Sequence, residues 1–201
     1  MLIVDSQVHI WGANAPERPW PKRQAPHRQP LGGDELLREM DAAGVARVVI
    51  VPPGWEGERN DLALEAVRLH PERFAVMGRL DPEDPEARTR LAAWRSQPGM
   101  YGIRLTFHTE WQRPLLTEGK LDWFWPIAER AGVRLMILAP HPLLHLIDAI
   151  AQLHPGLHIA VDHLGIPTKT KDDAAFAGLD RLLALTQLPQ LAVRFCGLSM
   201  S

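Results

Sequence analysis

Short apolar runs alternate with amphipathic segments along the whole of this 201-residue chain, and few folds accommodate that alternation. Several runs are almost continuous in Val, Ile and Leu, which is typical of strands buried on both faces of a parallel sheet. Successive runs start about 25 to 40 residues apart, the spacing of β-α-β crossover units. The predicted strands are Leu2–His9, Arg47–Val51, Phe74–Leu80, Tyr101–Thr106, Val133–Ala139, Leu157–Val161 and Leu191–Phe195.

Amphipathic helix patterns fill the intervals between these runs. Gly44 and Gly132 stand where a helix is expected to end, since glycine readily adopts the left-handed conformation of that position. The predicted helices are Asp34–Ala43, Asp61–His70, Pro85–Ser96, Trp123–Ala131, Leu143–Leu153 and Ala174–Leu185.

Right-handed crossovers make such strands parallel, so both a closed barrel and an open doubly wound sheet fit the pattern. No glycine-rich nucleotide-binding motif follows any predicted strand. Polar residues cluster instead after several strands, where barrel enzymes place their chemistry. We therefore predict an α/β fold of the (β/α)8 TIM-barrel type, with one domain over residues 1–201 and about seven of the eight strands.

Two features of the chain leave alternatives open. The sequence ends at Ser201, just after the seventh predicted strand, so we expect either a fragment or an open edge covered by another chain, as in a homo-oligomer. The long segment Gly12–Gly33 is rich in Pro, Arg and Gln, and is either a lid facing the substrate or an irregular surface loop.

Charge and composition limit the partners that we expect. The formal net charge is −2 and the charged residues are interspersed, so nothing favours nucleic acid or an anionic membrane. The N-terminus has no signal-peptide pattern, and the apolar runs are of strand length. The only cysteine, Cys196, excludes an intrachain disulfide. We expect a soluble, cytoplasmic protein that acts on a small molecule.

The first candidate site residues lie on the first predicted strand. Asp5, Gln7 and His9 share one face, because residues two apart on a strand point the same way. His9 lies at the carboxyl end, where a barrel enzyme would use it. The alternative is a structural polar network.

Two further strand ends carry polar candidates. His163 follows Asp162 after the sixth strand, and an imidazole there can bind a metal, polarise a carbonyl or transfer a proton. Arg104 lies within the fourth strand, where a buried guanidinium needs an anion. It would bind a substrate carboxylate, or form an internal ion pair with Asp5 or Asp162.

The remaining candidates carry weaker signals. His108 follows the fourth strand and His141 follows the fifth, and either could contact substrate. Trp11 and Trp55 could form the wall of a pocket or pack loops together.

Four short motifs occur in an order that resembles a known family. They are the opening Asp-x-x-Val-His-x-Trp, Gly-Ile-Arg in strand four, Asp-His-Leu-Gly after strand six and Val-Arg-Phe-Cys-Gly-Leu in strand seven. Together they resemble the amidohydrolase-related (amidohydrolase 2) branch of the amidohydrolase superfamily, which includes lactonases and some decarboxylases.

The resemblance implies roles for particular residues. His9 matches the second histidine of the family's His-x-His, and Gln7 replaces the first. His163 matches the strand-six histidine, and Arg104 matches an arginine that contacts substrate carboxylate. A divalent metal, zinc or manganese, would be held weakly by His9 and His163, since Gln7 is a poor ligand, and some lactonase-like relatives work without metal. The family's water-activating aspartate lies at the end of strand eight and has no counterpart in this sequence.

The resemblance therefore favours a hydrolase of a small carboxylated lactone or related ester or amide bond. Water would attack a carbonyl polarised by His9 and His163, with Arg104 on the carboxylate. The alternatives are a metal-dependent decarboxylase of the same family and a truncated, inactive barrel.

Overall fold

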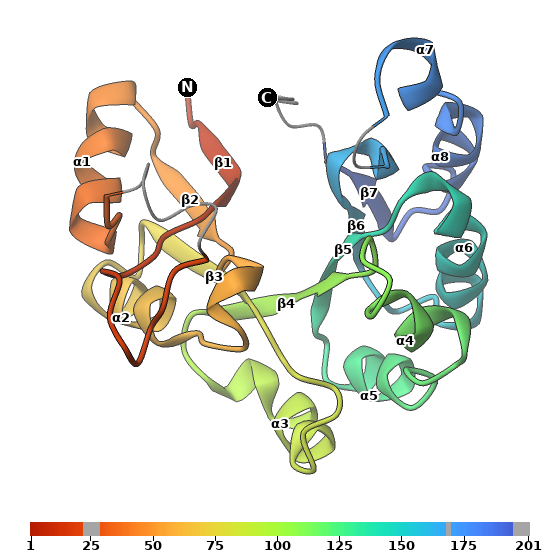
Figure 1. The fold of residues 1–201 in the computed structure, drawn as a ribbon, viewed down its shortest axis with the longest axis horizontal. Helices are drawn as coiled ribbons and strands as arrows, with labels where there is room; N and C mark the ends of the chain where they lie inside the picture. The colour runs from red at the N-terminus through yellow and green to blue at the C-terminus, as the bar shows by residue number, and fades with distance from the viewer. Residues whose placement is uncertain (22–28, 168–169, 195–201) are drawn as a thin grey trace. The chain divides into compact units, whose positions relative to one another are not determined.

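The computed structural model describes residues 1–21, 29–167 and 170–194, and contains seven parallel strands. Strand order follows the order of the chain, β1 to β7 (Figure 1). Doubly wound sheets change direction within the strand order, so this simple succession fits the barrel type. The strands are β1 Val4–Val8, β2 Arg47–Ile50, β3 Phe74–Gly78, β4 Met100–Thr106, β5 Arg134–Leu138, β6 Ile159–Val161 and β7 Leu191–Val193.

All seven predicted strands and most predicted helices are present. The helices are α1 Gly33–Ala43, α2 Asp61–Leu69, α3 Ala87–Ala92, α4 Arg113–Thr117, α5 Phe124–Arg130, α6 Leu144–Leu153, α7 Asp172–Ala175 and α8 Leu179–Leu185. As predicted, Gly44 ends α1 and Gly132 follows α5, each with positive φ.

The prediction of one continuous helix over Ala174–Leu185 is wrong. The segment forms the end of α7 and then α8, with Gly178 at the start of α8. Glycine weakens a helix interior by about 1 kcal/mol relative to alanine, which favours a break here. The helix predicted over Pro85–Ser96 is likewise shorter, because a 3-10 turn, Trp94–Ser96, replaces its last part.

The chain divides into two compact units. The first unit comprises Met1–Asp81 with Arg95–Gly102, and the second comprises Pro82–Trp94 with Ile103–Ser201. In the first, β1 pairs in parallel with β2, and β2 with β3. In the second, β5 pairs in parallel with β6, and β6 with β7. The single domain predicted from the sequence stays a prediction.

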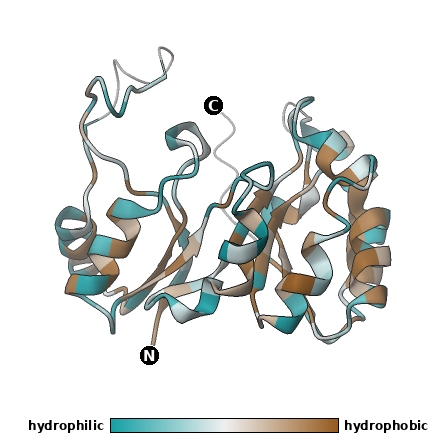
Figure 2. Cartoon of the chain, turned by 90° about the horizontal axis from the view of Figure 1, so that it is seen from below, coloured by the Kyte–Doolittle hydropathy of each residue, from teal (hydrophilic) through white to brown (hydrophobic). Residues whose placement is uncertain are grey.

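Each unit has its own apolar core beneath its helices. In the first, Ile50 and Val76 are fully buried; in the second, Ile137 and Val161 are. Burial of one such side chain stabilises a fold by about 1.5–3 kcal/mol. Figure 2 shows hydrophilic and hydrophobic residues on the same helices, as expected where one helix face packs on a sheet. The two cores hold the strands' carboxyl ends in register within each unit.

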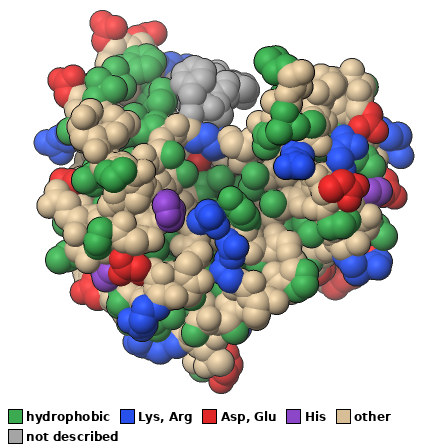
Figure 3. Space-filling model, turned by 180° about the vertical axis from the view of Figure 1, so that it is seen from behind, with side chains coloured by type: hydrophobic (Ala, Val, Ile, Leu, Met, Phe, Trp, Pro, Cys, Tyr) green, Lys and Arg blue, Asp and Glu red, His purple; other side chains and the backbone are tan. Residues whose placement is uncertain are grey.

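The absence of a polyanionic partner, expected from the net charge, stays a prediction. On the face shown in Figure 3, acidic and basic side chains are dispersed among uncharged ones, without a large area of one sign. Among the described residues, no helix is both long and apolar enough to cross a membrane. A homo-oligomer stays a prediction.

Candidate functional site

His9 lies one residue beyond β1 and is held by the backbone of the neighbouring strand end. Its Nδ1 lies 2.6 Å from the carbonyl oxygen of Val51. A carbonyl only accepts hydrogen bonds, so Nδ1 must carry a proton. In neutral His9 the other ring nitrogen, Nε2, is then an acceptor, and the Gln7 side-chain nitrogen lies 3.3 Å from it. Gln7 and His9, which were predicted to share one face of the first strand, are therefore in contact.

Gln7 fits poorly with a metal at His9. Its amide donates toward the same ring nitrogen, Nε2, that would supply the lone pair to a cation. Among the described residues, no group of three or more His, Cys, Asp or Glu side chains is arranged to hold a metal ion. The donor set at this strand end thus does not fit a firmly bound divalent cation.

Asp5, the third member of the predicted trio, bonds the backbone of its own strand. Its carboxylate accepts a hydrogen bond of 3.0 Å from the backbone nitrogen of Gln7. Asp5 is exposed, and the register of β1 against β2 shifts between Asp5 and Val8.

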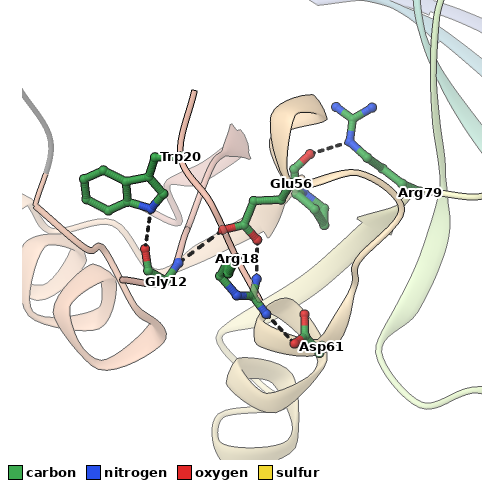
Figure 4. Close-up of polar contacts among 7 residues, drawn as sticks. Gly12, Arg18, Trp20, Glu56, Asp61 and Arg79 are labelled. Atoms are coloured by element: carbon green, nitrogen blue, oxygen red, sulfur yellow. Dashed lines mark hydrogen bonds and ion pairs between the residues drawn. The ribbon is translucent and has the colours of Figure 1, made fainter. Parts of the chain in front are cut away.

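The first part of the long Gly12–Gly33 segment is tied to the turn that follows β2. Arg18 forms ion pairs with Glu56 and Asp61, and Glu56 also accepts a hydrogen bond from the Gly12 backbone nitrogen (Figure 4). The Glu56 side chain is only 3% exposed, so the ion pair and the hydrogen bond offset the cost of burying its carboxylate. Trp20 donates to the Gly12 carbonyl at 2.9 Å. Residues 22–28, the centre of the predicted lid, lie outside the described residues.

Two tryptophans of the first unit, Trp11 and Trp55, lie near each other. The rings of Trp11 and Trp55 are 6.4 Å apart and tilted by 57°. Trp11 also donates to the carbonyl of Gln29 at 2.8 Å. They therefore pack loops together, and a substrate contact by Trp11 stays a prediction.

Arg79, directly after β3, was not singled out from the sequence. It is only 9% exposed, and its Nε donates to the carbonyl of Pro52 at 2.6 Å. Burial lowers the pKa of the Arg79 guanidinium, and the charge of Glu58 opposes that shift. A basic residue in an apolar strand end, Met-Gly-Arg-Leu, was the signal that could have revealed it.

A buried charge cluster lies at the strand ends of the second unit. Asp162 is fully buried and forms ion pairs with Arg104 and with Arg194, the latter at 2.7 Å from Arg194 Nε. Of the alternatives for Arg104, the internal ion pair with Asp162 is therefore present. Nη2 of Arg194 is buried and makes no hydrogen bond within the described part of the chain. Two guanidinium groups thus share the carboxylate of Asp162.

His163 follows this cluster on a strained turn. His163 and Leu164 both have positive φ, 52° and 55°, and Gly165 continues with 63°. Side chains with a Cβ rarely adopt this conformation, and each such residue costs of order 1–3 kcal/mol. Asp162 anchors the turn from one side, and the Ile166 nitrogen closes it on the His163 carbonyl at 3.0 Å. Strain of this kind concentrates at functional sites.

The weaker candidates of the second unit lie beside the same strand ends. His108 is half-buried after β4, in the segment following Thr106. His141 begins the turn after β5, and its ring lies so close to Gly178 that a Cβ there would approach within 2.3 Å. His141 is thus fixed by the start of α8. Cys196 lies outside the described residues.

Comparisons with known proteins agree with this architecture. The probable 2-pyrone-4,6-dicarboxylic acid hydrolase of Acinetobacter baumannii, solved with citric acid bound, is 18% identical with a TM-score of 0.77; the match covers 98% of this chain and 71% of that one. An amidohydrolase of Burkholderia multivorans with bound zinc is 22% identical with a TM-score of 0.66, over 96% and 69%. The 2,6-dihydroxybenzoate decarboxylase from Rhizobium is 19% identical with a TM-score of 0.56, over 82% and 67%.

Identities this low establish the shared fold and nothing finer. A comparison with curated proteins finds no match. The sequence itself supplies the stronger result, since the sequence model of one family, described as Amidohydrolase, matches residues 4–201. Together with the fold, that match shows that this chain belongs to the amidohydrolase family and is an enzyme of the amidohydrolase type.

Proposed function

We propose that the protein hydrolyses a small carboxylated lactone, or a related ester or amide bond. The observation that carries the proposal is the buried cluster of Arg104, Asp162 and Arg194, in which two guanidinium groups share one carboxylate directly before His163 in the chain. Two buried guanidinium groups at one carboxylate favour an anionic ligand, because the low dielectric of the interior strengthens the attraction. The similarity to a probable 2-pyrone-4,6-dicarboxylic acid hydrolase supports the same substrate class.

In this proposal His163 acts on the carbonyl under attack. His163 donates a hydrogen bond to the carbonyl oxygen, which stabilises the negative charge that develops as water adds to the carbon. His9, in the first unit, could donate to a ligand only with a proton on Nε2, because its Nδ1 proton points to Val51. The water must lose a proton and the ring oxygen must gain one as the C–O bond breaks. The family resemblance assigns the water's proton to an aspartate at the end of strand eight.

A pair of variants at the two ends of β6 tests the proposal. His163 follows the carboxyl end and His158 precedes the amino end, so the two substitutions to asparagine make the same chemical change at opposite edges. Hydrolysis of 2-pyrone-4,6-dicarboxylate and of simple carboxylated γ-lactones is followed by pH-stat. We expect His163→Asn to lower kcat about 10²–10⁴-fold, and His158→Asn to leave it within twofold. Equal activity of the two variants would refute the role of His163.

Metal-dependent decarboxylation is the second candidate, supported by the structural similarity to 2,6-dihydroxybenzoate decarboxylase. It needs a firmly bound cation, and the amide of Gln7 at His9 Nε2 disfavours one. Elemental analysis of the purified protein decides between the two. Stoichiometric zinc or manganese, with release of CO₂ that chelation abolishes, would favour the decarboxylase.

A further inference from the structure

Arg79 combines deep burial with unused hydrogen-bonding capacity. A guanidinium has five N–H donors, and only Nε, through the Pro52 carbonyl, is engaged. Within the residues that the structure describes, Nη1 and Nη2 donate to no protein acceptor and no carboxylate lies within ion-pair distance of Arg79, although the charge of Glu58 acts on it. In Figure 4 only Nε of Arg79 is joined by a dashed line. Among the described residues, the buried side-chain atoms without a hydrogen-bond partner do not include Nη1 or Nη2 of Arg79, so this end of the guanidinium reaches solvent and can meet a ligand.

The backbone of Arg79 is held as firmly as its Nε. The side chain of Asn60 accepts a hydrogen bond from the Arg79 nitrogen at 2.8 Å and donates to the Arg79 carbonyl at 2.9 Å. Asn60 stands at the N-cap of α2, where an asparagine side chain normally caps the helix and contributes about 1 kcal/mol. It makes no capping hydrogen bond here. The side chain of Asn60 thus leaves α2 without a side-chain cap, and its amide group holds the backbone of Arg79 instead.

Arg79 and His9 are supported by consecutive carbonyl groups. Val51 accepts from His9 and Pro52 accepts from Arg79, both at 2.6 Å, at the carboxyl end of β2. Successive carbonyls of an extended chain point in opposite directions, one toward each neighbouring strand. The turn after β2 therefore sets the imidazole and the guanidinium in a fixed relation at one edge of the first unit's sheet.

The chemistry of the unused nitrogens defines the ligand. Nη1 and Nη2 form a planar fork that matches the two oxygens of a carboxylate. We infer that Arg79 binds a carboxylate group of a small anionic ligand at the carboxyl ends of β1 to β3. The prior fixing of Nε and the backbone reduces the entropy lost when that ligand binds. The assignment of that carboxylate to the lactone substrate rests on the proposed function.

Calorimetric titration and NMR of the 201-residue protein test this inference. The probes are acetate, succinate and tricarballylate, used at low ionic strength so that screening does not mask the interaction. We expect saturable binding of at least one probe, and a shift of the Arg79 Nη–H resonances in arginine-labelled protein. A guanidinium with a purely structural role would leave those resonances unmoved.

The matched comparison uses variants of Arg79, which follows the carboxyl end of β3, and of Arg47, which begins β2. Arg79→Gln should weaken binding at least tenfold, about 1.4 kcal/mol, and Arg79→Lys less, because the charge remains and the fork is lost. Arg47→Gln removes the same charge from an exposed position at the amino end of β2, and should leave binding unchanged.

Two results would overturn the inference. They are a wild-type protein that binds none of the three probes, and binding that Arg79→Gln leaves intact. If Arg79→Gln fails to fold, the Nη–H resonances of the wild type still decide. If binding depends on Arg79 but the protein hydrolyses no lactone, this inference holds and the proposed function is refuted. If the protein hydrolyses a lactone but binding does not depend on Arg79, the proposed function holds and this inference is refuted.

Discussion

Replacement of Asp162 by asparagine is expected to be the most damaging single polar change in the second unit. Asp162 is fully buried, and the side chains of its partners Arg104 and Arg194 are only 4% and 10% exposed. The variant keeps the size of the side chain and removes the one negative charge. Two guanidinium groups are then left side by side with almost no water to screen them.

Removal of one partner from a buried ion pair destabilises a protein by about 3–5 kcal/mol. Since domains are stable by only about 5–15 kcal/mol, Asp162→Asn should lose a large part of the total. Urea unfolding followed by circular dichroism measures the loss, and hydrogen exchange of β5 to β7 locates it. The control is Asp148→Asn on α6, whose carboxylate accepts a hydrogen bond from Gln152, and which should change stability by about 0.5 kcal/mol or less.

A second substitution separates charge from packing. If the loss arises from two uncompensated positive charges, Arg194→Met in the Asp162→Asn background should recover part of it, with a coupling energy of about 0.5–3 kcal/mol. The reasoning is refuted if Asp162→Asn unfolds within about 1 kcal/mol of the wild type, or if Arg194→Met adds a further loss.

Three more changes have definite expected results. Gly178→Ala drives a methyl group into the ring of His141, so it should lower the thermal midpoint by several degrees and move the His141 ring resonances. The hydrogen bond from His154 holds the pKa of Glu129 below its ordinary value of 4.5, so the advantage of wild type over Glu129→Gln in urea midpoint should be present above that pH and vanish as the pH falls below it. Glu56→Gln leaves its arginine partner without a buried counter-charge, and limited proteolysis should then cut within residues 12–21 faster than in wild type.

The repeating pattern predicted the strands because parallel strands buried on both faces must be almost entirely apolar. Gly44 and Gly132 were predictable for a similarly local reason, the positive φ at the end of a helix. The break between α7 and α8 was missed, although Gly178, a residue that weakens a helix interior, lies beside it in the sequence. Local patterns thus predicted the elements, but one glycine within an amphipathic run was too weak a signal to show that the run forms two helices.

The polar partners needed three-dimensional information. From the sequence, Arg104 could pair with Asp5, with Asp162 or with a substrate carboxylate. Spacing along the chain does not show which of the three it meets. The structure pairs it with Asp162, while Asp5 is exposed and accepts from its own strand. Arg194 joins the cluster from 32 residues beyond Asp162. Neither pairing has a local signature, so no reading of residue spacing could have selected it.

The two units support their arginines with different chemistry, and this difference has a functional consequence. Arg104 and Arg194 are held by a carboxylate, which neutralises much of their field. Arg79 is held by the neutral carbonyl of Pro52 and the neutral amide of Asn60, so its support does not consume its charge. A group intended only to stabilise a fold is best paired with an opposite charge, since an unpaired buried charge is expensive. Although the charge of Glu58 also acts on Arg79, the neutral hydrogen-bonding partners leave the fork of the guanidinium available to a carboxylate that arrives from outside the chain.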